Sequence, residues 1–110
     1  MLFCLTANYT PTGLQAMAKN PSTKRRDVVE KLMAAAGGKL LAFYGTMADG
    51  PGAMSIVDID PGMAPAYAAV VASFDGIQNV RIQRLFTTDE VMDIQQKSIQ
   101  LQASFRPPGQ

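Results

Sequence analysis

Two short apolar segments constrain the fold of this chain more than any other feature of its sequence. Residues 2–8 (LFCLTAN) and 39–46 (KLLAFYGT) favour β-structure, and both are apolar at consecutive positions. Because successive side chains of a strand point to opposite faces, each segment presents apolar residues on both faces. In the first, Leu2 and Cys4 oppose Phe3, Leu5 and Ala7; in the second, Leu40, Ala42 and Tyr44 oppose Leu41 and Phe43.

An antiparallel sheet with one face in water normally alternates apolar and polar residues. Helices of the same chain can cover one apolar face, but 110 residues leave little room for a second core. The other face therefore needs a second molecule to cover it. We expect a homodimer or higher homo-oligomer, and an apolar content of 47% beside only 17% charged residues supports this.

The remaining pattern predicts a ferredoxin-like α+β fold of order βαββαβ, with a four-stranded antiparallel sheet and a C-terminal helix. We expect a single domain over residues 1–105 and a flexible tail over 106–110. The expected elements are strands over 2–8, 39–46, 53–60 and 77–86, a helix from Thr12, and helices over 22–36, 65–74 and 88–104.

Local signals set several of these boundaries. Asn20 precedes Pro21 and is therefore pushed away from helical angles, so the first helix breaks there and resumes at Ser22. Gly37 follows the resumed helix as a C-terminal cap. Thr87 and Glu90 have the spacing of a capping box and predict the start of the last helix.

Composition excludes several classes of function. The sequence has no histidine and one cysteine, Cys4, so zinc, copper and haem sites lack their usual ligands, and we expect no metal and no cofactor. Ten basic and nine acidic residues give a net charge of +1, which favours neither nucleic acid nor an anionic membrane. With no apolar run of the ~18 residues that span a bilayer, and no pattern of a signal peptide, we expect a cytoplasmic protein.

Three segments carry a family resemblance: residues 8–17 (NYTPTGLQAM), 31–47 (KLMAAAGGKLLAFYGTM) and 77–87 (IQNVRIQRLFT). Together with their spacing they resemble the GYD domain proteins of the dimeric α/β-barrel superfamily, over about residues 1–92. The resemblance implies a ferredoxin-like subunit whose sheet packs face to face against that of a second subunit. The superfamily includes cofactor-free monooxygenases, ligand-binding domains of regulators and haem-dependent enzymes, but the last match poorly because this chain has no histidine.

The sequence departs from the family at its Gly-Tyr-Asp signature, which lies near the second hairpin. Residues 48–52 (ADGPG) occupy that region with one extra residue, and they lack the aromatic side chain and the carboxylate that follows it. Asp49-Gly50 instead predicts a hairpin turn between two strands, whereas a phosphate-binding loop joins a strand to a helix. No activity is therefore transferred through this loop.

Polar side chains on the predicted strands could line a cavity. Tyrosine and arginine together could hold a phenolate, enolate or carboxylate, because arginine offers a two-pronged donor. Each side chain also has a simpler interpretation, as a core aromatic, a surface or ion-paired arginine, a helix cap or a turn carboxylate. The candidate ligand-binding residues are Asn8, Tyr9, Tyr44 and Arg81, and further candidates are Asp58 and Arg84.

The leading functional prediction is a homodimeric α/β-barrel protein that binds a small, largely apolar molecule between its sheet and helices. An alternative is a cofactor-independent monooxygenase or isomerase acting on an aromatic or enolisable substrate, with Tyr44, Asn8 and Arg81 as positioning groups. A third possibility is a structural oligomerisation module that uses the C-terminal helix.

Overall fold

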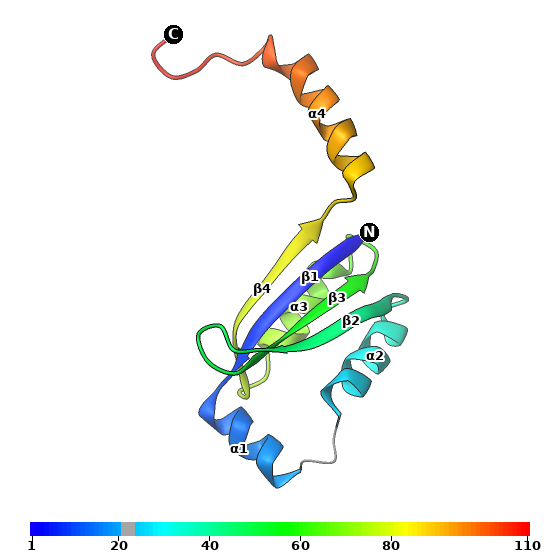
Figure 1. Ribbon diagram of the computed structural model, residues 1–110, viewed down its shortest axis with the longest axis vertical. Helices are drawn as coiled ribbons and strands as arrows, with labels where there is room; N and C mark the ends of the chain where they lie inside the picture. The colour runs from blue at the N-terminus through cyan, green and yellow to red at the C-terminus, as the bar shows by residue number, and fades with distance from the viewer. Residues whose placement is uncertain (21–23) are drawn as a thin grey trace.

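Four antiparallel strands form one open sheet in the order β2-β3-β1-β4, in a computed structural model that describes residues 1–20 and 24–110 (Figure 1). This strand order, with helices after β1 and β3, is that of a ferredoxin-like fold and confirms the predicted fold class. The elements are β1 (Leu2–Tyr9), α1 (Pro11–Lys19), α2 (Arg25–Ala35), β2 (Lys39–Thr46), β3 (Gly52–Asp58), α3 (Ala64–Ala72), β4 (Ile77–Leu85) and α4 (Thr88–Gln102).

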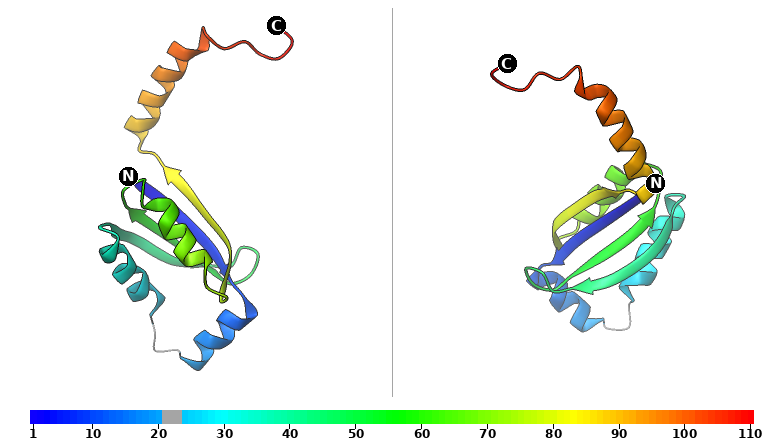
Figure 2. Two further views of the ribbon diagram at one scale, coloured as in Figure 1. Left: turned by 180° about the vertical axis from the view of Figure 1, so that it is seen from behind. Right: turned by 45° about the horizontal axis from the view of Figure 1, so that its top comes forward.

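The helices α2 and α3 cover one face of the sheet, and the other face is open (Figures 1 and 2). The core lies between these two layers, where Val57 of β3 and Met33 of α2 are almost completely buried. Leu5 of β1 and Tyr67 of α3 belong to the same apolar cluster. We call the uncovered side of the sheet the open face.

The helix boundaries follow the signals in the sequence. Thr10 caps α1 by accepting a hydrogen bond from the Gly13 amide at 3.0 Å, and Gly37 ends the α2 segment with a positive φ of 76°. Thr87 and Glu90 form the predicted capping box at the start of α4. Pro21 and Ser22, where the sequence predicts the break and restart of the helix, lie outside the described residues.

The faces of β1 follow strict alternation, but those of β2 do not. Phe3, Leu5 and Ala7 pack on the helix side, as predicted. In β2 a register shift between Leu40 and Ala42 places Leu40 in the helix-side core, opposite Val57. Our assignment of Leu40 to the same face as Ala42 and Tyr44 was therefore wrong, because a β-bulge inserts an extra residue and interrupts the two-residue period.

The last helix, α4, projects away from the sheet (Figure 1). Of the residues that the structure describes, none belonging to α4 is buried. The radius of gyration is 17.9 Å, whereas a compact domain of this length has a value of about 13 Å. The single chain is therefore extended by a helix that packs on neither layer of the fold.

Candidate functional site

A cavity of about 100 Å³ lies between the sheet and the two helices that cover it. Its floor is formed by helix-side residues of the central strands, including Leu5 and Ala7 of β1 and Ala53 of β3. Phe43 of β2 lines one side. Because Ala7 and Ala53 are small and pair directly across β1 and β3, they leave space that larger side chains would fill.

The walls of the cavity come from the two covering helices. Val28, Val29 and Leu32 of α2 face Val70 and Val71 of α3 across it. Val28 and Val29 are one helical turn from Leu32, so they lie on the same side of α2. The lining is therefore almost wholly apolar, which suits the burial of a hydrocarbon group.

The depth of the cavity contains one hydrogen-bonded polar pair. The Ser55 Oγ of β3 and the Tyr67 Oη of α3 are 2.9 Å apart, and both residues are buried. Burial raises the pKa of the Tyr67 phenol above its ordinary value, and the hydrogen bond with Ser55 opposes this in part. Tyr67 is therefore a neutral hydroxyl at neutral pH.

This pair has hydrogen-bonding capacity to spare. Two hydroxyl groups carry two protons, and the bond between Ser55 and Tyr67 uses one of them. The second proton is available to an acceptor atom placed in the cavity. The site can thus accept an apolar ligand with one oxygen or nitrogen acceptor near its buried end.

The mouth of the cavity opens beside the first residue of α2, Arg25. Tyr9, Arg25, Val28, Phe74 and Ile77 line both the cavity and a shallower outer groove of about 430 Å³. The outer groove runs between α1, α2 and the turn that follows α3. The inner and outer spaces therefore adjoin at these residues.

Among the residues proposed from the sequence, Tyr9 lines this cavity. Asn8 lies on the other side of β1, and its side chain holds the β2–β3 hairpin loop: Nδ2 donates to the carbonyl oxygens of Ala48 at 2.9 Å and Gly50 at 3.3 Å. Its Oδ1 accepts from Asn79 Nδ2 at 3.3 Å. Neither amide atom is without a protein partner, and the role as a helix cap belongs to Thr10 instead.

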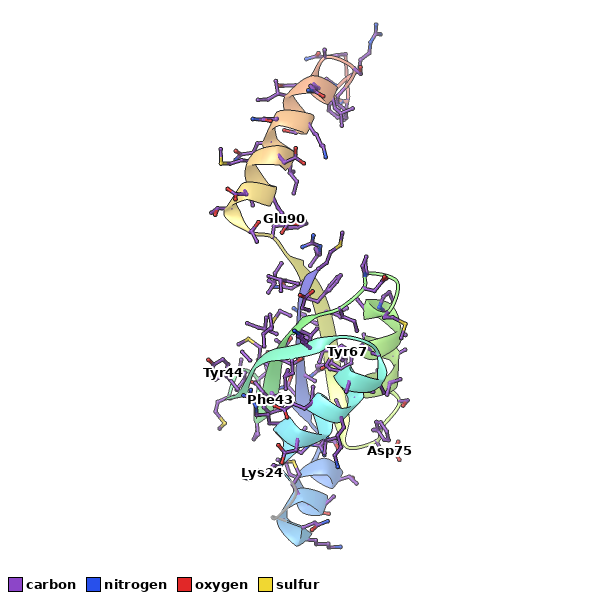
Figure 3. All side chains as sticks on the ribbon, turned by 90° about the vertical axis from the view of Figure 1, so that its right-hand side faces the viewer. Lys24, Phe43, Tyr44, Tyr67, Asp75 and Glu90 are labelled. Atoms are coloured by element: carbon purple, nitrogen blue, oxygen red, sulfur yellow. The ribbon has the colours of Figure 1, made fainter. Side chains whose placement is uncertain are left out.

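Tyr44 and Arg81 both belong to the open face, but they are far apart. Thr6 pairs with Arg81 on one side and Met54 on the other, and Met54 pairs with Tyr44. Because three strand spacings of about 4.8 Å each lie between them, the Cα atoms of Tyr44 and Arg81 are about 14 Å apart. Figure 3 shows Tyr44 on the side of the sheet away from the helices. Arg81 lines a polar groove of about 470 Å³ near the hairpin loop, together with Asn8 and Asp49.

The other two candidates have local partners. Arg84 Nη2 lies 2.7 Å from Glu90 Oε2, and its guanidinium stacks on the ring of Phe86 with 4.5 Å to the ring centroid. Asp58 Oδ1 lies 2.8 Å from the Met1 amine. Both residues therefore serve the structure, and Arg84 joins the end of β4 to the start of α4.

Metal and thiol chemistry find no support in the described structure. Over residues 1–20 and 24–110 no three His, Cys, Asp or Glu residues lie close enough together to hold a metal ion. Burial raises the pKa of the Cys4 thiol, which favours the unreactive protonated form. In the same part of the chain, no helix is both long enough and apolar enough to cross a lipid bilayer.

Sequence reasoning missed three residues of this site: Ser55, Tyr67 and Arg25. For two of them, the sequence contains a pattern that could have identified them. Ser55 is the one hydroxyl residue in the apolar strand segment 53–57 (AMSIV), and Tyr67 is the one polar side chain in the apolar helix segment 64–72 (APAYAAVVA). Lone hydroxyls within buried elements need partners and so point to each other or to a ligand.

The four-stranded sheet, its two covering helices and the apolar cavity between them define a ferredoxin-like α+β protein with space for a small molecule. Comparison with known families narrows this class, since the GYD domain family matches residues 3–94 of the 110-residue chain. The chain therefore belongs to the GYD domain family. No curated protein sequence matches it.

Proposed function

We propose that this protein is a homodimer that binds a small, largely apolar molecule between its sheet and helices. The observation that carries the proposal is the apolar cavity of about 100 Å³ that opens at Tyr9 and Arg25. Well-packed interiors contain few voids larger than a water molecule, so a cavity of this size needs a reason. For comparison, an apolar cavity of about 150 Å³ holds benzene.

The size and lining of the cavity set the chemistry of the ligand. It accommodates one aromatic ring or a short branched aliphatic group, in contact with Phe43, Leu32 and Val71. One acceptor atom on the buried end can take the spare proton of the Ser55–Tyr67 pair. A strongly polar or charged group at that end would lose its hydration without replacement.

Titration with toluene tests the cavity directly. In protein labelled at its methyl groups, we expect saturable NMR shifts of Leu5, Val29 and Leu32 on adding toluene. In Ala53→Ile the larger side chain fills the floor of the cavity and should abolish these shifts. Ala69→Ile, at an exposed position of α3 outside the cavity lining, is the matched control and should leave them unchanged. Shifts that never saturate, or that persist in Ala53→Ile, would contradict binding in the cavity.

The homodimer is supported by the composition of the open face. Leu2 and Cys4 of β1 with Met54 and Ile56 of β3 form an apolar centre on this face. Charged and polar residues lie on the outer strands β2 and β4. An apolar centre with a polar rim is the usual composition of a protein interface, and a second copy presents the same surface under a two-fold axis.

A role in structural assembly is a second candidate, favoured by α4. Val91, Ile94 and Leu101 lie three and seven residues apart along this helix, Phe105 follows just beyond its end, and all four are exposed. This is the pattern of a helix that packs against another helix. If α4 holds the assembly together, truncation after Phe86 should lower the number of chains per assembly, which light scattering gives as the measured molar mass divided by that of one chain. An unchanged number would show that α4 is not needed for assembly.

The enzymatic alternative receives no support from the geometry. It requires Tyr44, Asn8 and Arg81 to converge on one substrate. Asn8 uses its amide on the hairpin loop, and about 14 Å separate Tyr44 from Arg81. Tyr9, the remaining candidate, lines the cavity on the opposite face of the sheet.

A further inference from the structure

One cationic residue, Arg25, lines the mouth of the apolar cavity. Arg25 lines both the inner cavity and the outer groove, so its side chain lies where the two spaces meet. Among the described residues, none forms an ion pair with Arg25. Its neighbour Arg26 is paired with Glu30 at 3.1 Å and lines neither space. An arginine without an internal partner is available to an anion from outside.

Two further features favour an anionic group at this point. Arg25 is the first residue of α2, whose 11 residues place the positive end of the helix dipole there. Lys24 precedes it and adds a second positive charge to the same end. The opposing charges are Asp27, in the first turn of α2 but lining neither space, and Asp75, which lines the outer groove and not the inner cavity.

We propose that the natural ligand of the cavity is a small monocarboxylate, with its apolar body inside and its carboxylate on the Arg25 guanidinium. This inference rests on the proposed binding function and adds the class of ligand. The guanidinium can hold a carboxylate through two parallel hydrogen bonds. Asp75, farther out, disfavours a second carboxylate in the groove and so selects monoacids over diacids.

Three probes with the same ring separate the contributions of body and head group. Toluene supplies the apolar body alone, phenylacetate adds a carboxylate that is ionised at pH 7, and benzylamine adds a cation. We expect phenylacetate to bind about tenfold more tightly than toluene, as one charge-assisted hydrogen-bonded pair at a partly exposed site allows. Benzylamine should bind no more tightly than toluene.

Two adjacent arginines provide a matched pair of variants. Arg25→Ala should weaken phenylacetate binding about tenfold and leave toluene binding unchanged. Arg26→Ala makes the same change in net charge one position along the helix and should alter neither. Arg25→Gln serves as a second variant that removes the charge but keeps a polar side chain, and circular dichroism checks that all three remain folded.

The outcomes distinguish the two proposals. If toluene binds but phenylacetate binds no more tightly, or if Arg25→Ala and Arg26→Ala behave alike, the carboxylate inference is overturned and the cavity function stands. If neither toluene nor phenylacetate binds to the folded wild-type protein, the cavity function itself fails, and the inference fails with it. Tighter binding of benzylamine than of phenylacetate would also overturn the inference. This comparison requires only the wild-type protein.

Discussion

At the scale of single residues, the buried pair of Ser55 and Tyr67 combines stability with the candidate site. Tyr67→Phe removes the hydrogen bond at 2.9 Å and leaves the Ser55 hydroxyl without its partner. We expect the free energy of unfolding to fall by about 1–2 kcal/mol. The double variant Ser55→Ala/Tyr67→Phe removes both polar groups and should be no less stable than the single variant. Urea unfolding measures both; a double variant that is clearly less stable than Tyr67→Phe would contradict this coupling.

The same pair predicts a dependence of stability on alkaline pH. Because burial raises the pKa of Tyr67 in the folded state, its contribution to stability is complete below the ordinary value of 10.0 and is lost as the pH rises through the raised value. Urea unfolding between pH 8 and pH 11.5 should therefore show a smaller loss of stability in Tyr67→Phe than in wild type. Burial raises the pKa of Cys4 in both proteins, so the difference between them reports Tyr67 together with its charge interaction with Cys4. Parallel curves would show that Tyr67 does not carry this dependence.

Gly13 marks a close approach between two backbone segments. A Cβ atom at this position would lie 2.2 Å from the Gly76 carbonyl oxygen, which belongs to the turn before β4. Gly13→Ala must therefore displace α1, and we expect a loss of about 1–3 kcal/mol. At Gly45 the nearest atom to an added Cβ is 4.0 Å away, so Gly45→Ala is the control and should change the melting temperature much less. Equal shifts in the two variants would argue against the close contact.

At the scale of elements, the start of α4 depends on one carboxylate. Glu90 accepts from the Thr87 amide at 3.0 Å and pairs with Arg84, and the first of these contacts is the main cause that lowers the pKa of Glu90 below its ordinary 4.5. A lowered pKa means that the stabilisation is present above pH 4.5 and is lost as the pH falls through the lower value.

We therefore expect the first turn of α4 to fray below pH 4.5. NMR shifts of its Cα carbons should move toward random-coil values as the pH decreases from 6 to 2. In Glu90→Gln the amide can still accept from Thr87 but does not titrate, so the first turn should lose this dependence on pH. An identical acid transition in Glu90→Gln would assign it to another group.

The elements also show which structural features the local sequence can predict and which it cannot. The caps at Gly37 and at Thr87 with Glu90 were predictable because each involves residues within about one helical turn. The bulge in β2 was not, because it depends on pairing with β3. It moves Leu40 into the core and reverses the alternation that residues 39–46 display by themselves.

At the scale of the whole molecule, the open face and the detached α4 both expose apolar surface. We expect wild-type protein to sediment as a dimer. Ile56→Glu places a charge at the apolar centre of the open face, where burial against a partner would be strongly unfavourable, and should give monomers. Ala69→Glu adds the same charge to an exposed position of α3 and should remain dimeric. A dimer that tolerates Ile56→Glu would place the interface elsewhere.

The sequence by itself determined the order of the elements, their caps, the ferredoxin-like class and the apolar character of both sheet faces, because periodicity and capping act over a few residues. The tertiary structure decided which polar groups meet. Ser55 and Tyr67 are 12 residues apart and come within 2.9 Å only when α3 packs on β3. Likewise, Asn8 is held by a loop some 40 residues away. The cavity exists because small residues of two strands lie beneath two helices, and that coincidence requires contacts between segments distant in the chain.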